Sequence, residues 1–166
     1  MNAENLAKAQ EILRRFPQKS SALIPLLHVV EEEFGYIPPE EVANVADLMG
    51  VTEAYVESVL SFYTLFHRQP TGKYLIQVCR GLSCQLLGAD DLSKFLYEEL
   101  GVQRNGTTAD GMFTVEEVEC VALCKNAPAV QINLAFYPDM TKEKLQAFLE
   151  KAREEVRSGA GDEAAL

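Results

Sequence analysis

Apolar residues in the first seventy positions recur every three or four residues, which is the spacing of one face of an α-helix. Gly35 and Gly50 each follow such a stretch, and glycine commonly ends a helix. Residues 1–70 are therefore predicted to form a helical segment. The predicted helices are Glu4–Phe16, Ser20–Phe34, one that opens at Pro39, and one that follows a capping Thr52.

The pattern changes after Pro70-Thr71-Gly72, where short apolar runs begin to alternate with helical stretches. The order is strand–helix–strand–strand–helix, which is typical of an α/β domain. This domain is predicted over 71–157, with a frayed tail at 158–166. Its predicted parts are strand Tyr74–Val78, helix Ala89–Leu100, loop Gln103–Gly111, strand Phe113–Val118, strand Ala129–Asn133 with a return over Leu134–Pro138, and helix Thr141–Val156.

The charge is acidic in both parts of the chain. The net charge is −10, and residues 1–70 carry five Lys and Arg against ten Asp and Glu. Nucleic-acid binding is disfavoured, because phosphate contacts need clustered cations. No segment approaches the roughly 18–20 unbroken apolar residues of a membrane span, and the N-terminus lacks the pattern of a secretory signal. Membrane contact is therefore expected only through partners.

All the cysteines lie in two short segments, C-x4-C at Cys79–Cys84 and C-x3-C at Cys120–Cys124. Each segment follows a predicted strand, so we expect both to leave one edge of the sheet as neighbouring loops. Paired cysteines in a chain without a secretory signal more often bind metal or carry out redox chemistry than form structural disulfides. Gly81 is expected to give the first loop freedom to turn.

The spacing favours a [2Fe–2S] cluster, which takes four thiolates, two on each iron. Loops of this length can reach round such a cluster. Zinc, two disulfides and unconnected buried thiols stay open on the residues alone. A thiol–disulfide enzyme is disfavoured, since it would use C-x-x-C. His28 and His67 lie outside both loops and are interpreted as packing or surface residues.

Two longer segments, FYTLFHRQPTGKYLIQVCRGLSCQLLGADDL (62–92) and MFTVEEVECVALCKNAPAVQIN (112–133), closely resemble the E-type subunits of bacterial NADH-quinone oxidoreductase. The resemblance runs from about Ser21 to about Leu149 and includes Asn126-Ala127-Pro128. It implies an α/β protein in which an N-terminal helical bundle precedes a thioredoxin-like [2Fe–2S] ferredoxin domain. The residues that it implies as ligands of one cluster are Cys79, Cys84, Cys120 and Cys124.

The resemblance also implies the chain's role. It implies an electron-transfer subunit of respiratory complex I, an oxidoreductase and translocase, with no catalytic residues of its own. FMN and NADH would bind an F-type partner subunit, beside other peripheral-arm subunits. The expected location is cytoplasmic and peripheral to the inner membrane through the complex. The equivalent subunit of an NAD(P)-linked hydrogenase or formate dehydrogenase is the alternative, followed by a zinc-stabilised interaction module.

Two departures from the family pattern touch the site. The family commonly has C-L-G-x-C, but here Val121-Ala122-Leu123 separate the cysteines and the second loop is expected to differ in shape. An acidic residue often follows the strand's Asn, but here it is Leu134. Glu116, Glu117 and Glu119 precede Cys120; they form either a solvated strand face or a negative field that lowers the reduction potential. Phe66 ends an aromatic stretch that suits core packing or docking.

Overall fold

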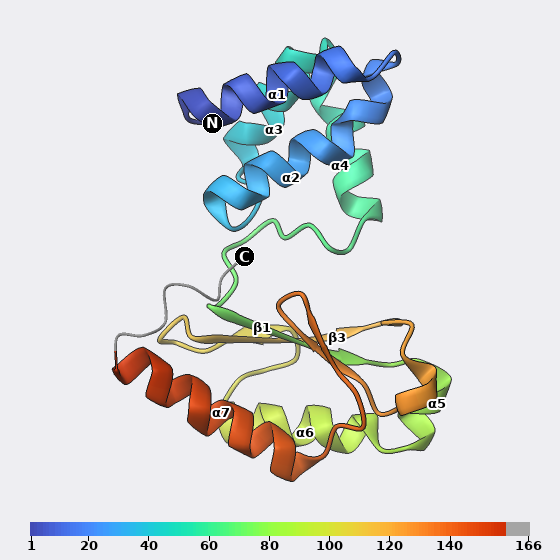
Figure 1. Ribbon diagram of the computed structural model, residues 1–166, viewed down its shortest axis with the longest axis vertical. Helices are drawn as coiled ribbons and strands as arrows, with labels where there is room; N and C mark the ends of the chain where they lie inside the picture. Colours follow the sequence, from blue (N-terminus) through green and yellow to red (C-terminus); the bar gives the residue numbers. More distant parts are fainter. Residues whose placement is uncertain (159–166) are drawn as a thin grey trace. The chain divides into compact units, whose positions relative to one another are not determined.

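The computed structural model describes residues 1–158 and divides into two compact units between Pro70 and Thr71 (Figure 1). Each unit has its own buried apolar core, as an independent domain does. The tail predicted to fray, 158–166, lies outside the described residues apart from Ser158.

Helices form the first unit, and their ends follow local capping chemistry. The side chain of Asn2 accepts a hydrogen bond from the backbone N–H of Asn5, and Thr52 does the same for Tyr55. Gly35 ends one helix with φ of 74°. These helices match the predicted ones within a few residues. They are α1 (Ala3–Arg15), α2 (Leu23–Phe34), α3 (Pro39–Met49) and α4 (Glu53–Phe62), with a 3₁₀ turn at Lys19–Ala22.

The core of this unit also contains Phe66, which is 7% exposed. Its ring centroid lies 4.9 Å from that of His28. Phe66 is therefore a packing residue, and the docking interpretation is wrong for this side chain. The other members of the aromatic stretch, Phe62, Tyr63 and Leu65, are exposed, so for them docking stays a prediction. His28 and His67 both lie beside Glu31, at 3.5 and 3.9 Å, in the packing or surface positions predicted for them.

A mixed sheet forms the centre of the second unit, with strand order β2-β3-β1-β4-β5. β1 and β3 run parallel in register from Tyr74↔Phe113 to Cys79↔Val118, whereas β4 and β5 add antiparallel strands. The elements are β1 (Tyr74–Cys79), α5 (Leu82–Leu86), α6 (Ala89–Leu100), β2 (Gly106–Thr107), β3 (Phe113–Val118), β4 (Val130–Ile132), β5 (Ala135–Tyr137) and α7 (Lys142–Arg157).

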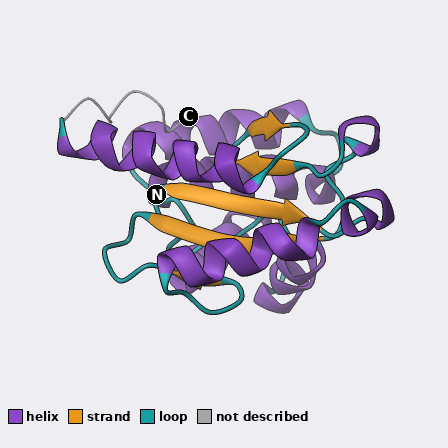
Figure 2. Cartoon of the chain, turned by 90° about the horizontal axis from the view of Figure 1, so that it is seen from below, coloured by secondary structure: helices purple, strands orange, loops and turns teal. Residues whose placement is uncertain are grey.

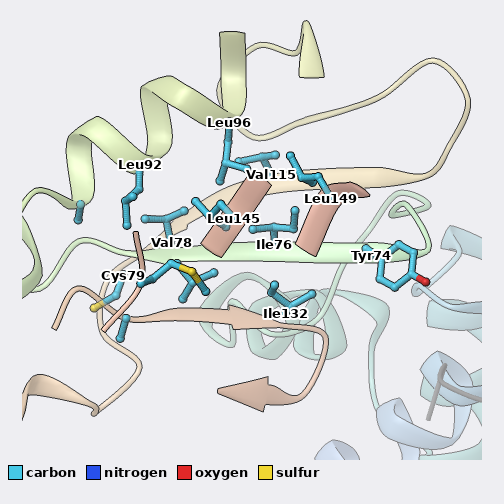
Figure 3. Close-up of a cluster of buried hydrophobic side chains, with 14 of the residues drawn as sticks. Tyr74, Ile76, Val78, Cys79, Leu92, Leu96, Val115, Ile132, Leu145 and Leu149 are labelled. Carbon is cyan, nitrogen blue, oxygen red and sulfur yellow. The ribbon is translucent and has the colours of Figure 1, made fainter. Parts of the chain in front are cut away.

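Helices α6 and α7 lie along the same face of this sheet (Figures 1 and 2). Leu96 of α6 and Leu149 of α7 are fully buried in one cluster with Ile76 and Val115 of the central strands (Figure 3). Removing such side chains from water is the main stabilising contribution to a small domain of this kind. The helices thus pack against β1 and β3, the two strands that lead to the cysteine segments.

One strand and one α-helix of the second unit were not predicted. Part of the predicted loop Gln103–Gly111 is strand β2, which pairs with β3 at Gly106↔Val115. The short helix α5 begins at Leu82, within the C-x4-C segment, and ends just beyond it at Leu86. Two strand residues or a five-residue helix are too short to show a hydrophobic period, so neither could be read from the pattern.

Gly72 occupies a position with no room for a side chain. A Cβ there would lie 2.7 Å from the backbone carbon of Phe113, and the Gly72 N–H donates to Thr114 Oγ1 at 2.6 Å.

Overfilling a packed site costs roughly 1–3 kcal/mol. We expect Gly72→Ala to lower the free energy of unfolding by about that amount, measured by urea titration. Lys73→Ala, at the next and more exposed position, is the control and should change it less.

Candidate metal centre

The four cysteines lie at the carboxyl ends of the two parallel strands. Cys79 is the last residue of β1 and Cys84 lies in α5, and both are buried. Cys120 follows β3, and Cys124 opens a 3₁₀ turn over Cys124–Asn126; both are exposed. Parallel strands end at the same sheet edge, so the prediction that both cysteine segments leave one edge is confirmed.

The thiols are neighbours across the two loops. Those of Cys84 and Cys120 both help to lower the pKa of Cys79, and Cys124 helps to raise the pKa of Cys84. The backbone carbonyl of Glu119 lies 3.9 Å from Cys79 Sγ. Sulfurs from both loops also flank Gly81, where a Cβ would lie 3.4 Å from Cys79 Sγ and 4.0 Å from Cys120 Sγ. Within residues 1–158, no set of three or more His, Cys, Asp or Glu side chains is spaced to hold a metal ion.

Backbone N–H groups point at the sulfurs. Gly81 N lies 3.4 Å from Cys79 Sγ, and Ala122 N lies 3.3 Å from Cys120 Sγ. Burial opposes ionisation of Cys79, but the N–H groups of Gly81 and Val121, with the neighbouring thiols, lower its pKa below the ordinary value. A thiolate is the form that binds metal, so this environment favours a ligand.

Cys84 has the opposite tendency. Burial raises the pKa of its thiol, and the nearby Cys79 and Cys124 raise it further, although a backbone N–H at Ala129 acts against them. A buried thiol of this kind gains most from a bound cation, because coordination removes its proton outright. The two buried cysteines therefore differ. The surroundings of Cys79 favour its thiolate form, whereas Cys84 would lose its proton on binding a metal.

Gly81 has φ of −58°, which any residue adopts, so the expectation that it supplies turning freedom is wrong. A Cβ at this position would make ordinary van der Waals contacts with the Cys79 and Cys120 sulfurs. Neither the backbone conformation nor the available space therefore requires a glycine here.

The second loop keeps a left-handed residue without a glycine. Ala122, at the position where the family commonly has glycine, has φ of 59°. The expected change in loop shape through loss of positive φ is therefore wrong at this residue. An L-residue in this region costs roughly 1–2 kcal/mol, and the N–H of the same Ala122 donates to Cys120 Sγ.

Hydrogen bonds join the end of the second loop to the strand that carries the first ligand. Cys79 N donates to the carbonyl of Ala129 at 3.2 Å, and Met140 N donates to the carbonyl of Pro128 at 2.8 Å. The Ala127–Pro128 peptide is cis. The Asn-Ala-Pro segment therefore connects the second cysteine loop with β1 and with the turn before α7.

The three carboxylates before Cys120 have different surroundings. Glu116 accepts a hydrogen bond from Gln77 Nε2 at 3.2 Å. Glu117 forms ion pairs with Arg80 and Arg104, and Glu119 is exposed. The different contacts of these three carboxylates indicate that they do not share one role. The arginines beside Glu117 had no signal in the sequence, since only the fold brings them there.

The family model for the thioredoxin-like [2Fe-2S] ferredoxin matches residues 9–153. The chain belongs to this family. The match confirms the fold class and the resemblance predicted from the cysteine segments. A two-iron cluster takes four thiolates, and the two adjacent loops carry four thiols, with N–H groups on the sulfurs of Cys79 and Cys120, so the chemistry of the donor set fits such a cluster.

Relatives of high similarity are components of one kind of enzyme. The E subunit of the Mycobacterium tuberculosis NADH-quinone oxidoreductase is 41% identical over 148 residues, which are 89% of this chain and 59% of the relative. The E subunit of the Rickettsia bellii enzyme is 38% identical over 153 residues, covering 90% and 92%. Subunit 2 of the Thermus thermophilus NADH-quinone oxidoreductase is 41% identical over 143 residues, covering 84% and 79%. The chain thus spans 59% of the mycobacterial relative's length.

A solved structure shares the fold of this ferredoxin family member. It is an NAD⁺-reducing [NiFe]-hydrogenase in the air-oxidised state, with a TM-score of 0.71 and 22% identity. The match covers 81% of this chain and 23% of the hydrogenase chain. At this identity the likeness supports the fold alone. Within residues 1–158, no helix combines the length and apolar character needed to cross a bilayer.

We expect Ala122→Gly to raise the free energy of unfolding by roughly 0.5–1 kcal/mol. The left-handed conformation suits glycine, and the gain is partly offset by the larger entropy that glycine loses on folding. Denaturant titration at matched iron content measures the change. Ala109→Gly, in another exposed loop but outside the left-handed region, is the control and should be neutral or slightly destabilising. A less stable Ala122→Gly protein would contradict the strain assigned to this loop.

Proposed function

We propose that this chain is the electron-transfer subunit of an NADH-quinone oxidoreductase and carries one [2Fe–2S] cluster. The proposed ligands are Cys79, Cys84, Cys120 and Cys124. The observation that carries the proposal is that two loops, each with two cysteines, leave the same sheet edge, with a backbone N–H group on one sulfur of each loop. The names of the relatives and the family match support it.

When bound, such a cluster takes up and releases one electron at a time. The chain's own part is to hold and tune it. N–H groups of Gly81 and Ala122 stabilise negative charge on the ligand sulfurs, which is one of the ways proteins set a cluster's potential. The inner cysteines are shielded from water, whereas Cys120 and Cys124 are exposed. The exposed side is therefore the side on which we expect electrons to enter and leave.

The partner in this proposal is a flavoprotein. FMN and NADH would bind an F-type subunit, and this chain would dock on it together with other peripheral-arm subunits. The chain would thus work at the cytoplasmic side of the inner membrane through the complex. In line with this division of labour, the sequence contains no G-x-G-x-x-G or Walker-type loop.

Anaerobic purification tests the cluster. We expect a brown protein with about two irons and about two acid-labile sulfides per chain, and a paramagnetic signal on reduction, as four-thiolate two-iron clusters give. Metal analysis and electron paramagnetic resonance measure these properties. A colourless protein that contains zinc in place of iron would overturn the proposal.

Single cysteine substitutions test the ligands. Because each cysteine would supply one of the four thiolates, Cys84→Ala and Cys120→Ala should each lose most of the bound iron and the visible absorbance. Ser83→Ala, in the same loop as Cys84, should keep both. Circular dichroism verifies that each variant is folded. Full iron content in either cysteine variant would remove that residue from the ligand set.

Co-purification from the native cell tests the parent complex. We expect a tagged chain to bring down the FMN- and NADH-binding subunit of NADH-quinone oxidoreductase, identified by mass spectrometry. Recovery of hydrogenase or formate dehydrogenase subunits in its place would assign the chain to one of those assemblies. The iron measurement would be unaffected by that outcome.

A further inference from the structure

Glu117, in β3, has three partners from other parts of the second unit: a loop residue after β1, one before β2, and one in α6. Its Oε2 lies 3.3 Å from Arg80 Nε and 3.0 Å from an Arg104 guanidinium nitrogen. Its Oε1 accepts a hydrogen bond from the Tyr97 hydroxyl at 3.0 Å. The carboxylate is only 13% exposed. We call these four residues the Glu117 cluster.

The Glu117 cluster lies at the entry of the first cysteine loop. Arg80 directly follows Cys79, and its backbone N–H donates to the Val118 carbonyl at 2.7 Å, which extends the β1–β3 pairing by one bond. Glu117 pairs with Val78, the residue before Cys79. The backbone of Arg80 is therefore fixed at the start of a loop that carries two of the proposed ligands, and its guanidinium is held by Glu117 of the neighbouring strand.

The charges of the Glu117 cluster do not cancel. Two guanidinium groups share one carboxylate, so the cluster carries one net positive charge. Tyr97 adds no negative charge, because burial and the hydrogen bond to Glu117 raise the pKa of its hydroxyl to about 12. The side chain of Arg80 is 40% exposed but fixed at its Nε by a mostly buried partner. An arginine held in this way acts as a stationary charge.

We propose that Glu117 holds Arg80 beside the Cys79–Cys84 loop, and that the charge of Arg80 raises the reduction potential of the centre carried there. Glu117 is thus a positioning residue, and Arg80 sets the potential through space. This inference rests on the proposed [2Fe–2S] function. A fixed positive charge stabilises the form that has gained an electron, and net charge near the centre is a main determinant of cluster potential.

This role differs from the simple one expected for the carboxylates before Cys120. An isolated Glu117 would only disfavour adding an electron. A Glu117 that fixes Arg80 does two opposing things: its own charge lowers the potential, and the cation that it holds raises it. The two roles predict different outcomes for the same substitution.

The test uses the full chain with its cluster, and redox titration followed by electron paramagnetic resonance. We expect Arg80→Gln to lower the midpoint potential, with the equilibrium constant for reduction falling about threefold, or about 28 mV for one electron. Arg153→Gln is the matched control. Arg153 forms a comparable partly exposed pair with Glu99 near the far end of α6 and should leave the potential unchanged. A shift in Arg80→Gln no larger than in the control overturns the inference.

Glu117→Gln tests the positioning role by itself. Its matched control is Glu116→Gln, which removes the same charge from the neighbouring β3 position. We expect a smaller rise in potential for Glu117→Gln than for Glu116→Gln, or a fall, because Arg80 is released. An equal or larger rise contradicts the inference. This comparison decides the question even if Arg80→Gln fails to retain its cluster.

A double-mutant cycle links the two residues. In the Glu117→Gln background, Arg80→Gln should shift the potential by less than half of its effect in the unaltered chain. Undiminished effect there would show that Glu117 does not hold Arg80. Iron content separates this inference from the function on which it rests. If the unaltered chain binds no iron, the proposed function is wrong. If it binds the cluster but Arg80→Gln leaves the midpoint potential unchanged, only this inference is wrong.

Discussion

Parallel pairing of β1 with β3 is the constraint on which the site depends. The pairing brings Cys79 opposite Val118, so that two loops separated by about forty residues of chain start side by side. Two antiparallel strands would have sent these loops to opposite ends of the sheet. The crossover that parallel pairing requires is supplied by α5 and α6, and α6 in turn buries Leu92 and Leu96 against the strands. The same helix therefore packs the core and allows the parallel pairing that places the cysteine loops side by side.

Within this frame the two halves of the cysteine group differ in surroundings. Cys79 and Cys84 lie in the core cluster, whereas Cys120 and Cys124 belong to a loop that solvent reaches. The inner half gains rigidity from the sheet and from α5. The outer half depends on local backbone geometry, including a left-handed alanine at Ala122. The family match and the relatives from NADH-quinone oxidoreductases give this arrangement its context.

Much of the fold could be predicted from the sequence because its elements are long and locally capped. The helix Ala89–Leu100 was predicted with the bounds that the structure has, since a clear apolar stripe ends at Gly101. The cysteine segments stood out by spacing, and the sheet edge that they share followed from the strand before each. Sequence reasoning failed where the feature was short or depended on distant contacts. α5 has five residues, and β2 has two.

The same limit applies to the site's surroundings. Arg80, Tyr97 and Arg104 all lie well before Glu117 in the sequence, and nothing local marks them as its partners. The conformations of Gly81 and Ala122 were also beyond reach. Composition rules associate positive φ with glycine, yet here the glycine is ordinary and the alanine is left-handed. Tertiary contacts override such preferences residue by residue.

The burial of Cys79 and Cys84 has a consequence for how the centre would be built. Their positions are fixed by β1, by α5 and by the hydrogen bond from Cys79 N to the Ala129 carbonyl, none of which involves a metal. Folding alone therefore places Cys79 and Cys84, two of the four proposed ligands. Iron and sulfide arriving from solvent would meet the exposed Cys120 and Cys124 first. Cluster assembly would then proceed from the exposed pair of ligands toward the buried pair.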